Sequence, residues 1–168
     1  MDNIIISIRK ALQEENWYGA LFMAITLPDI CAYLEHGKAN GKNYSSWFEN
    51  NLTKYKGFLS GDDCYSLRCA VLHQNTDDIS SQGMKDVLDH YIFITQGGHL
   101  NFFKDCVVVG IKESFLQLNV TKFCDDICVA VENWISLNSG NQYINDRLKQ
   151  TLEIHKPGYI YKGSIKFG

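Results

Sequence analysis

The sequence predicts a mainly helical bundle that forms a single domain over residues 1–168, with a small antiparallel β element inserted between its fourth and fifth helices. Apolar residues recur three and four positions apart over most of the chain, as on the buried face of a helix. One central stretch is instead rich in β-branched and aromatic residues. The chain is 45% apolar and only 21% charged, which is enough apolar material to bury a core.

The first half of the chain has the pattern of four helices. The first begins at Asp2 or Asn3, either of which can cap a helix. The second covers 17–36, although Pro28 is expected to end or kink it at Leu27.

A short third helix is expected to open at Asn43 or Ser45. The fourth covers roughly 62–73, and the small polar and acidic residues 60–63 before it are typical of a helix start.

The central stretch predicts strands. Segments 91–95 and 100–103 flank Gln96-Gly97-Gly98, which is typical of a hairpin turn. Residues 106–109 fit either a buried strand or a buried helix segment, and 114–120 alternate as a strand with one apolar face. That face carries Leu116, Leu118 and Val120.

Two helices complete the bundle. Thr121 is expected to cap a long helix with a continuous apolar stripe, which ends at 138–140. The last helix is expected over 142–155. Residues 145–168 carry a net charge of +3, whereas the preceding part of the chain carries −6. Aromatic residues lie between the lysines of this segment, which include Lys162. This segment fits either RNA contact or a solvated helix end followed by a short strand or tail.

Composition favours a cytoplasmic protein with no membrane span. The longest uncharged apolar run, 19–27, is about half of what crosses a bilayer, and the N-terminus lacks the regions of a signal peptide. The six cysteines form no CxxC pair, so we expect reduced, buried thiols. Cys124 and Cys128 lie one helical turn apart but lack further ligands, and we expect neither a metal nor another cofactor.

The segment 63–75 carries the most informative pair of residues. Arg68 and His73 have R-x4-H spacing near the end of a capped helix. With a helical bundle on both sides, this segment resembles the HEPN superfamily, whose bundles carry an R-x4-6-H motif and dimerise so that two motifs meet in one cleft. The closest likeness is to an uncharacterised bacterial and plasmid-borne HEPN branch, in which a small sheet interrupts the bundle.

The resemblance implies metal-independent cleavage of RNA through a cyclic phosphate. Such a reaction needs a base near neutral pH and a cation for the phosphorane, which imidazole and guanidinium supply. We therefore expect His73 to act as base or acid and Arg68 to clamp the phosphate. Residues assisting them are Asp29, as an orienting acid, and Tyr65, as part of the cleft wall.

Helix geometry adds an expectation about assembly. Positions five apart on an ideal helix point roughly 140° apart. We therefore expect Arg68 and His73 to form a composite site in a homodimer, unless the helix frays before His73.

Competing interpretations remain open. In a purely structural interpretation, Arg68 forms an ion pair with Asp29 or Asp63. His73 is then a cation that the helix dipole favours at the C-terminus, and Asp29 is an acid near a helix N-terminus. Cys69 also stands where catalytic HEPN sequences often have a polar residue. The first hypothesis is an endoribonuclease, a toxin with a cognate antitoxin protein or a phage-defence effector. The second is a catalytically silent HEPN module that binds RNA or nucleotide, or only dimerises.

Overall fold

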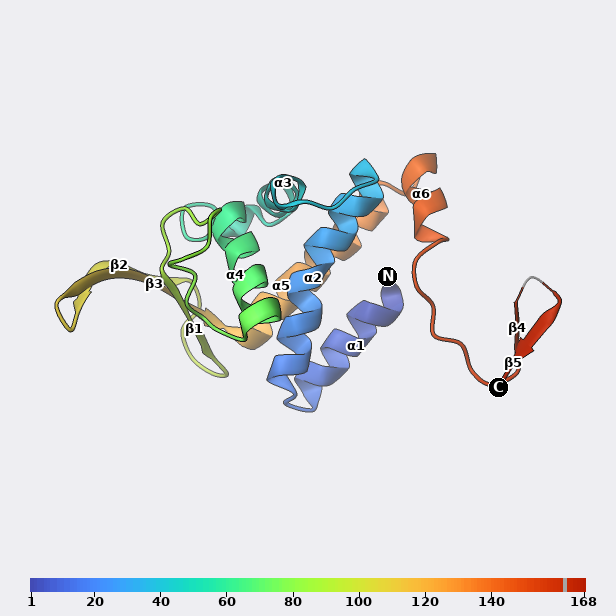
Figure 1. The fold of residues 1–168 in the computed structure, drawn as a ribbon, viewed down its shortest axis with the longest axis horizontal. Coiled ribbons are helices and arrows are strands. Elements are labelled where there is room, and N and C mark those ends of the chain that lie inside the picture. Colours follow the sequence, from blue (N-terminus) through green and yellow to red (C-terminus); the bar gives the residue numbers. More distant parts are fainter. Residues whose placement is uncertain (162) are drawn as a thin grey trace.

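In the computed structural model, which describes residues 1–161 and 163–168, the helices form a bundle with a small sheet at one end and a C-terminal hairpin at the other (Figure 1). Helix α2 (Trp17–His36) runs through the middle of the bundle and contacts the other helices. The predicted mainly helical class is therefore confirmed. The other helices are α1 (Asp2–Gln13), α3 (Gly41–Asn51), α4 (Gly61–Gln74), α5 (Val120–Leu137) and α6 (Gln142–Leu148), with a short 3₁₀ turn η1 (Thr53–Tyr55).

Side-chain caps start most of these helices. Asn40 accepts a hydrogen bond from the backbone N–H of Asn43, so α3 begins a few residues before the predicted start. Ser60 caps α4 as predicted, by accepting from the N–H of Asp63. Asn119 rather than Thr121 caps α5.

Pro28 lies inside α2, so the expectation that the helix ends at Leu27 is wrong. A proline in a helix removes one backbone hydrogen bond and costs about 3 kcal/mol. Here Pro28 and Leu27 are both buried in the bundle, where packing offsets that cost. Asp29 therefore lies on the same continuous helix as the first turns of α2.

Among the described residues, α2 is the one helix long and apolar enough to cross a membrane. Its apolar stretch is 50% buried inside the bundle.

The inserted sheet is mixed, not antiparallel. Its strands are β1 (His90–Ile94), β2 (Asn101–Val108) and β3 (Ile111–Asn119), in the order β1-β3-β2. β1 pairs with β3 in parallel, and β2 pairs with β3 antiparallel. The predicted hairpin at Gln96-Gly97-Gly98 is therefore wrong, because that segment crosses over the end of β3.

The hairpin turn lies instead at Val109-Gly110, where both residues have positive φ. β3 takes the centre of the sheet because Leu116 and Leu118 are fully buried against the bundle. Val107 and Val108 at the end of β2 and Val109 in the turn are exposed, and Cys106 is half-buried, so the predicted burial of this segment is wrong.

The C-terminus differs from the predicted long helix. α6 stops at Leu148, and an extended segment leads to a hairpin of β4 (Tyr159–Tyr161) and β5 (Ile165–Phe167) that stands apart from the bundle (Figure 1). Lys162, part of the basic segment, lies outside the described residues.

Candidate functional site

Arg68 lies between Asp29 and His73 on one side of the bundle. Its Nε donates to Oδ2 of Asp29 across 2.7 Å, and its Nη1 lies 3.3 Å from Nε2 of His73. Asp29 comes from α2, whereas Arg68 and His73 both come from α4. Two helices of a single chain therefore bring the three polar groups into one hydrogen-bonded row.

The expectation that a second subunit must bring Arg68 and His73 together is wrong. The 140° estimate describes only the directions in which two Cβ atoms leave the helix. The long Arg68 side chain reaches toward His73 in the last turn of α4, which ends one residue later. The contact itself therefore requires neither fraying before His73 nor a dimer.

The contact defines the hydrogen-bonding state of His73. A guanidinium carries only donors, so Nε2 of His73 is the acceptor in this contact. The lone pair of Nε2 that accepts this hydrogen bond is also the one that would accept a proton, so Arg68 must leave it before His73 can act as a base. The residue is exposed to solvent.

Asp29 and Arg68 are more enclosed, with side chains that are 16% and 23% exposed. Burial raises the pKa of Asp29, although the guanidinium of Arg68 opposes that shift. Asp29 therefore holds Arg68 in position from a partly desolvated place on α2.

Tyr65 lies one turn before Arg68 and is half-buried. Its ring packs edge-on against Tyr44, with centroids 5.3 Å apart, and both Tyr65 and Arg68 contact Cys69. Tyr65 therefore borders the row of polar groups through Cys69, and within the described part of the chain its hydroxyl makes no hydrogen bond to Asp29 or His73.

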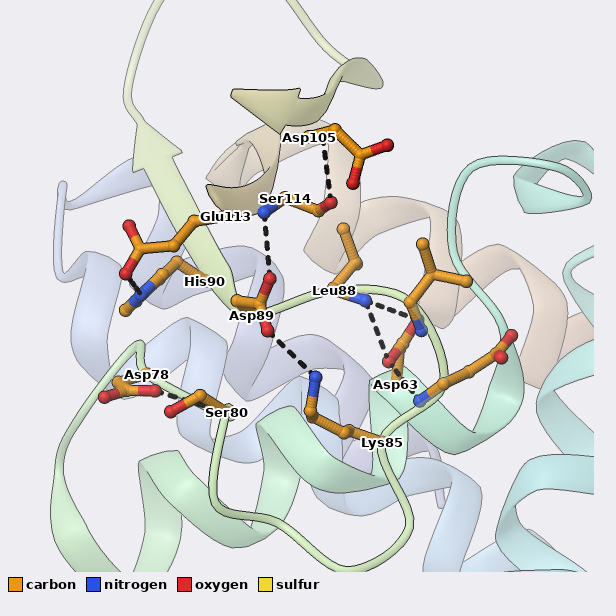
Figure 2. Close-up of polar contacts among 12 residues, drawn as sticks. Asp63, Asp78, Ser80, Lys85, Leu88, Asp89, His90, Asp105, Glu113 and Ser114 are labelled. Carbon is orange, nitrogen blue, oxygen red and sulfur yellow. Dashed lines mark hydrogen bonds and ion pairs between the residues drawn. The ribbon is translucent and has the colours of Figure 1, made fainter. Parts of the chain in front are cut away.

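Asp63, the alternative partner of Arg68, holds a loop instead (Figure 2). Its carboxylate accepts the backbone N–H groups of Asp86 at 2.7 Å and Val87 at 3.2 Å, and it also accepts from Leu88. Burial raises the pKa of Asp63, which these hydrogen bonds oppose. The residue therefore fixes the segment that leads from α4 to β1.

Asp89, at the end of the same loop, and His90, at the start of β1, both contact strand β3 (Figure 2). Asp89 accepts from Lys85 at 2.8 Å and from the N–H of Ser114 at 2.9 Å. His90 lies 3.4 Å from Glu113 across the parallel strands. His90 is a half-buried residue of β1.

A second polar cluster was not anticipated from the sequence. Tyr55 donates to Asp126 at 2.8 Å and lies 3.2 Å from Nε2 of His99, while Lys54 pairs with Asp126. The backbone N–H of Asn119 donates to Nδ1 of His99. Burial lowers the pKa of His99, so this histidine of the loop between β1 and β2 is a mostly buried, neutral link between η1, the sheet and α5.

The cysteines of the described residues are all free thiols, and four of them are buried. Burial raises the pKa of Cys64 to about 12 and that of Cys128 to about 12, as expected for unreactive core thiols. Within residues 1–161 and 163–168, no group of three or more His, Cys, Asp or Glu side chains is arranged to hold a metal ion.

Comparisons of the chain with protein-family models, with curated proteins and with solved structures find no match. Any functional assignment therefore depends on the geometry and chemistry of the site itself.

Proposed function

We propose that the chain is a HEPN-type, metal-independent endoribonuclease whose reacting groups are His73 and Arg68. The observation that supports this most directly is the 3.3 Å contact between Arg68 Nη1 and Nε2 of His73. It brings a base at the exposed end of α4 and a fixed cation from the middle of α4 together. RNA cleavage without a metal requires both groups.

The chemistry follows from these two groups. His73 Nε2 takes the proton of a ribose 2′-hydroxyl as that oxygen attacks the adjacent phosphorus. The bond from phosphorus to the 5′-oxygen of the next nucleotide breaks, and that oxygen takes up a proton from an imidazolium. The products are a 2′,3′-cyclic phosphate and a 5′-hydroxyl end.

Arg68 changes partner in this scheme. A bound phosphate oxygen takes the Nη1 donor and releases Nε2 of His73 for the 2′-hydroxyl. Asp29 keeps Nε fixed at 2.7 Å, so the guanidinium meets the phosphorane charge without reorienting. Asp29 is thus a positioning residue, and Tyr65 forms part of the wall beside Arg68.

A homodimer remains part of the proposal for a chemical reason. One His73 acts as base while the departing 5′-oxygen needs an acid, and two motifs in one cleft supply both. Sedimentation at micromolar concentration is expected to show a dimer. A monomer that still cleaves RNA would restrict the site to one chain.

The alternative is a catalytically silent HEPN module that binds RNA or nucleotide, or only dimerises. Cys69 favours this alternative, because no hydroxyl or amide follows Arg68 to orient the phosphate. The net charge of −3 also gives no general attraction to RNA.

The biological setting of the proposal is a cytoplasmic toxin with a cognate antitoxin protein, or a phage-defence effector. Expression of the wild type in a bacterium is expected to stop growth and degrade RNA, whereas His73→Ala is tolerated. Equal growth and intact RNA with both proteins, at equal soluble levels, would favour the silent module.

A further inference from the structure

A cavity of about 510 Å³ opens at the surface of the bundle, and Asp29, Arg68 and His73 are not among the described residues that line it. The first turns of α2, the end of α4 and strand β1 form its walls. Its lining includes the aromatic residues Trp17, Tyr18, Phe22, Tyr91 and Phe93. Tyr18 is 72% exposed, so its ring is available to a ligand.

The position of the cavity relative to Arg68 follows from the two helices. Asp29 of α2 contacts Arg68 of α4, whereas earlier residues of α2 meet later residues of α4 in the cavity wall. The helices therefore run in opposite directions. From Phe22 to Asp29 the rise is about 10 Å over two turns, with both residues on one face. One extended nucleotide spans this length from phosphate to base.

The lining distinguishes between the parts of a nucleotide. Among the described residues that line the cavity none is basic, and Asp77 is acidic. A phosphate is therefore disfavoured inside. Asn75 and Thr76 add polar side chains, which suit the hydrogen-bonding edge of a base, and the aromatic walls suit its faces.

We infer that this cavity binds a nucleobase of a single-stranded RNA whose phosphate contacts Arg68. The inference rests on the proposed function, because Arg68 supplies the phosphate contact. Stacking of the base between Tyr18 and the apolar wall then fixes which phosphate of the RNA contacts Arg68. The substrate is single-stranded, because a base inside a duplex cannot enter a cavity.

Binding can be measured apart from cleavage. A 2′-O-methylated dinucleotide lacks the attacking hydroxyl and stays intact. Trp17 lines the cavity, whereas Trp47 and Trp134 are 2% and 5% exposed, so quenching of tryptophan fluorescence reports on the cavity.

Two variants leave the fold in place. Tyr18→Ala removes an exposed ring, and Asn75→Gly removes a side chain at a left-handed φ of 54° that glycine adopts readily. The control is Tyr143→Ala, because Tyr143 is 78% exposed and lies on α6. Tyr18→Ala is expected to weaken dinucleotide binding about tenfold, the scale of one lost stacking face, and the control to leave it unchanged.

The outcomes separate the two proposals. Weaker binding by Tyr18→Ala and Asn75→Gly, but not by Tyr143→Ala, supports the cavity whether or not the wild type cleaves RNA. If the wild type cleaves RNA and Tyr18→Ala binds the dinucleotide as tightly as the wild type, the nucleobase-binding role of the cavity is overturned and the proposed ribonuclease activity stands. Loss of self-association in Tyr18→Ala without any effect on dinucleotide binding makes the cavity a protein contact and overturns the inference.

Discussion

Asp29 Oδ2 accepts the Nε–H of Arg68 across 2.7 Å and so ties the middle of α2 to the middle of α4. The pair is neither fully exposed nor fully buried, with side chains 16% and 23% exposed. It therefore contributes to stability and also fixes the guanidinium beside His73. A variant at Asp29 tests both effects.

Asp29→Asn is expected to lower the free energy of unfolding by about 1–2 kcal/mol, between the values for surface and buried ion pairs. It is also expected to lower RNA cleavage about tenfold, because Arg68 loses its charged anchor but keeps its own charge. Urea denaturation and cleavage rates measure the two effects. Glu35→Gln, at an exposed site of the same helix, is the control. Equal values for the two variants would exclude a positioning role.

Asp63→Ala is expected to destabilise the protein by about 2–4 kcal/mol, because backbone N–H groups of residues 86–88 lose their acceptor. Asp63→Asn keeps one acceptor oxygen and is expected to lose less. Limited proteolysis between α4 and β1 should accelerate in Asp63→Ala. Asp2→Ala, which removes another first-turn acid, is the control for the helix-dipole effect. Equal rates of proteolysis in Asp63→Ala and Asp2→Ala would contradict the role of Asp63 in holding this loop.

His99 predicts a dependence of stability on pH. Its folded-state pKa is lowered by burial, so below about pH 6.5 the unfolded chain takes up a proton that the folded chain resists. Stability contributed by this residue is therefore lost as the pH falls from about 7.5 toward 5.5.

His99→Asn is expected to flatten this slope, because the amide oxygen can accept from the N–H of Asn119 in place of Nδ1 and does not titrate. Thermal melting at several pH values measures it. His36→Asn, at an exposed histidine on α2, is the control and should keep the wild-type slope. A slope unchanged in His99→Asn would contradict the buried, neutral assignment.

Local features of the fold could be predicted from the sequence. Ser60 capped α4 as predicted, and the alternation that buries Leu116 and Leu118 was correct. Strand order was not predictable, because the pattern of each strand is compatible with more than one neighbour. The predicted helix end at Pro28 was wrong, because burial in the bundle outweighs the local preference of proline to break a helix.

The candidate site was predictable in its residues but not in its geometry. R-x4-H spacing singled out Arg68 and His73, and Asp29 was one of two expected partners of Arg68. Angular spacing along a helix ignores the reach of an arginine side chain, so the contact within one chain was missed. His99 was missed because Tyr55 and Asp126 are distant in sequence.

Cleavage of a single-stranded RNA by the purified protein in excess EDTA tests the central claim most directly. The wild type is expected to leave 2′,3′-cyclic phosphate ends, since imidazole and guanidinium supply the chemistry. His73→Ala and Arg68→Ala are each expected to lower the rate by about 10²-fold or more, with His36→Ala as the control at wild-type rate. Melting temperatures establish that all the variants are folded. Cleavage that persists in folded His73→Ala, or that requires magnesium, would contradict the account.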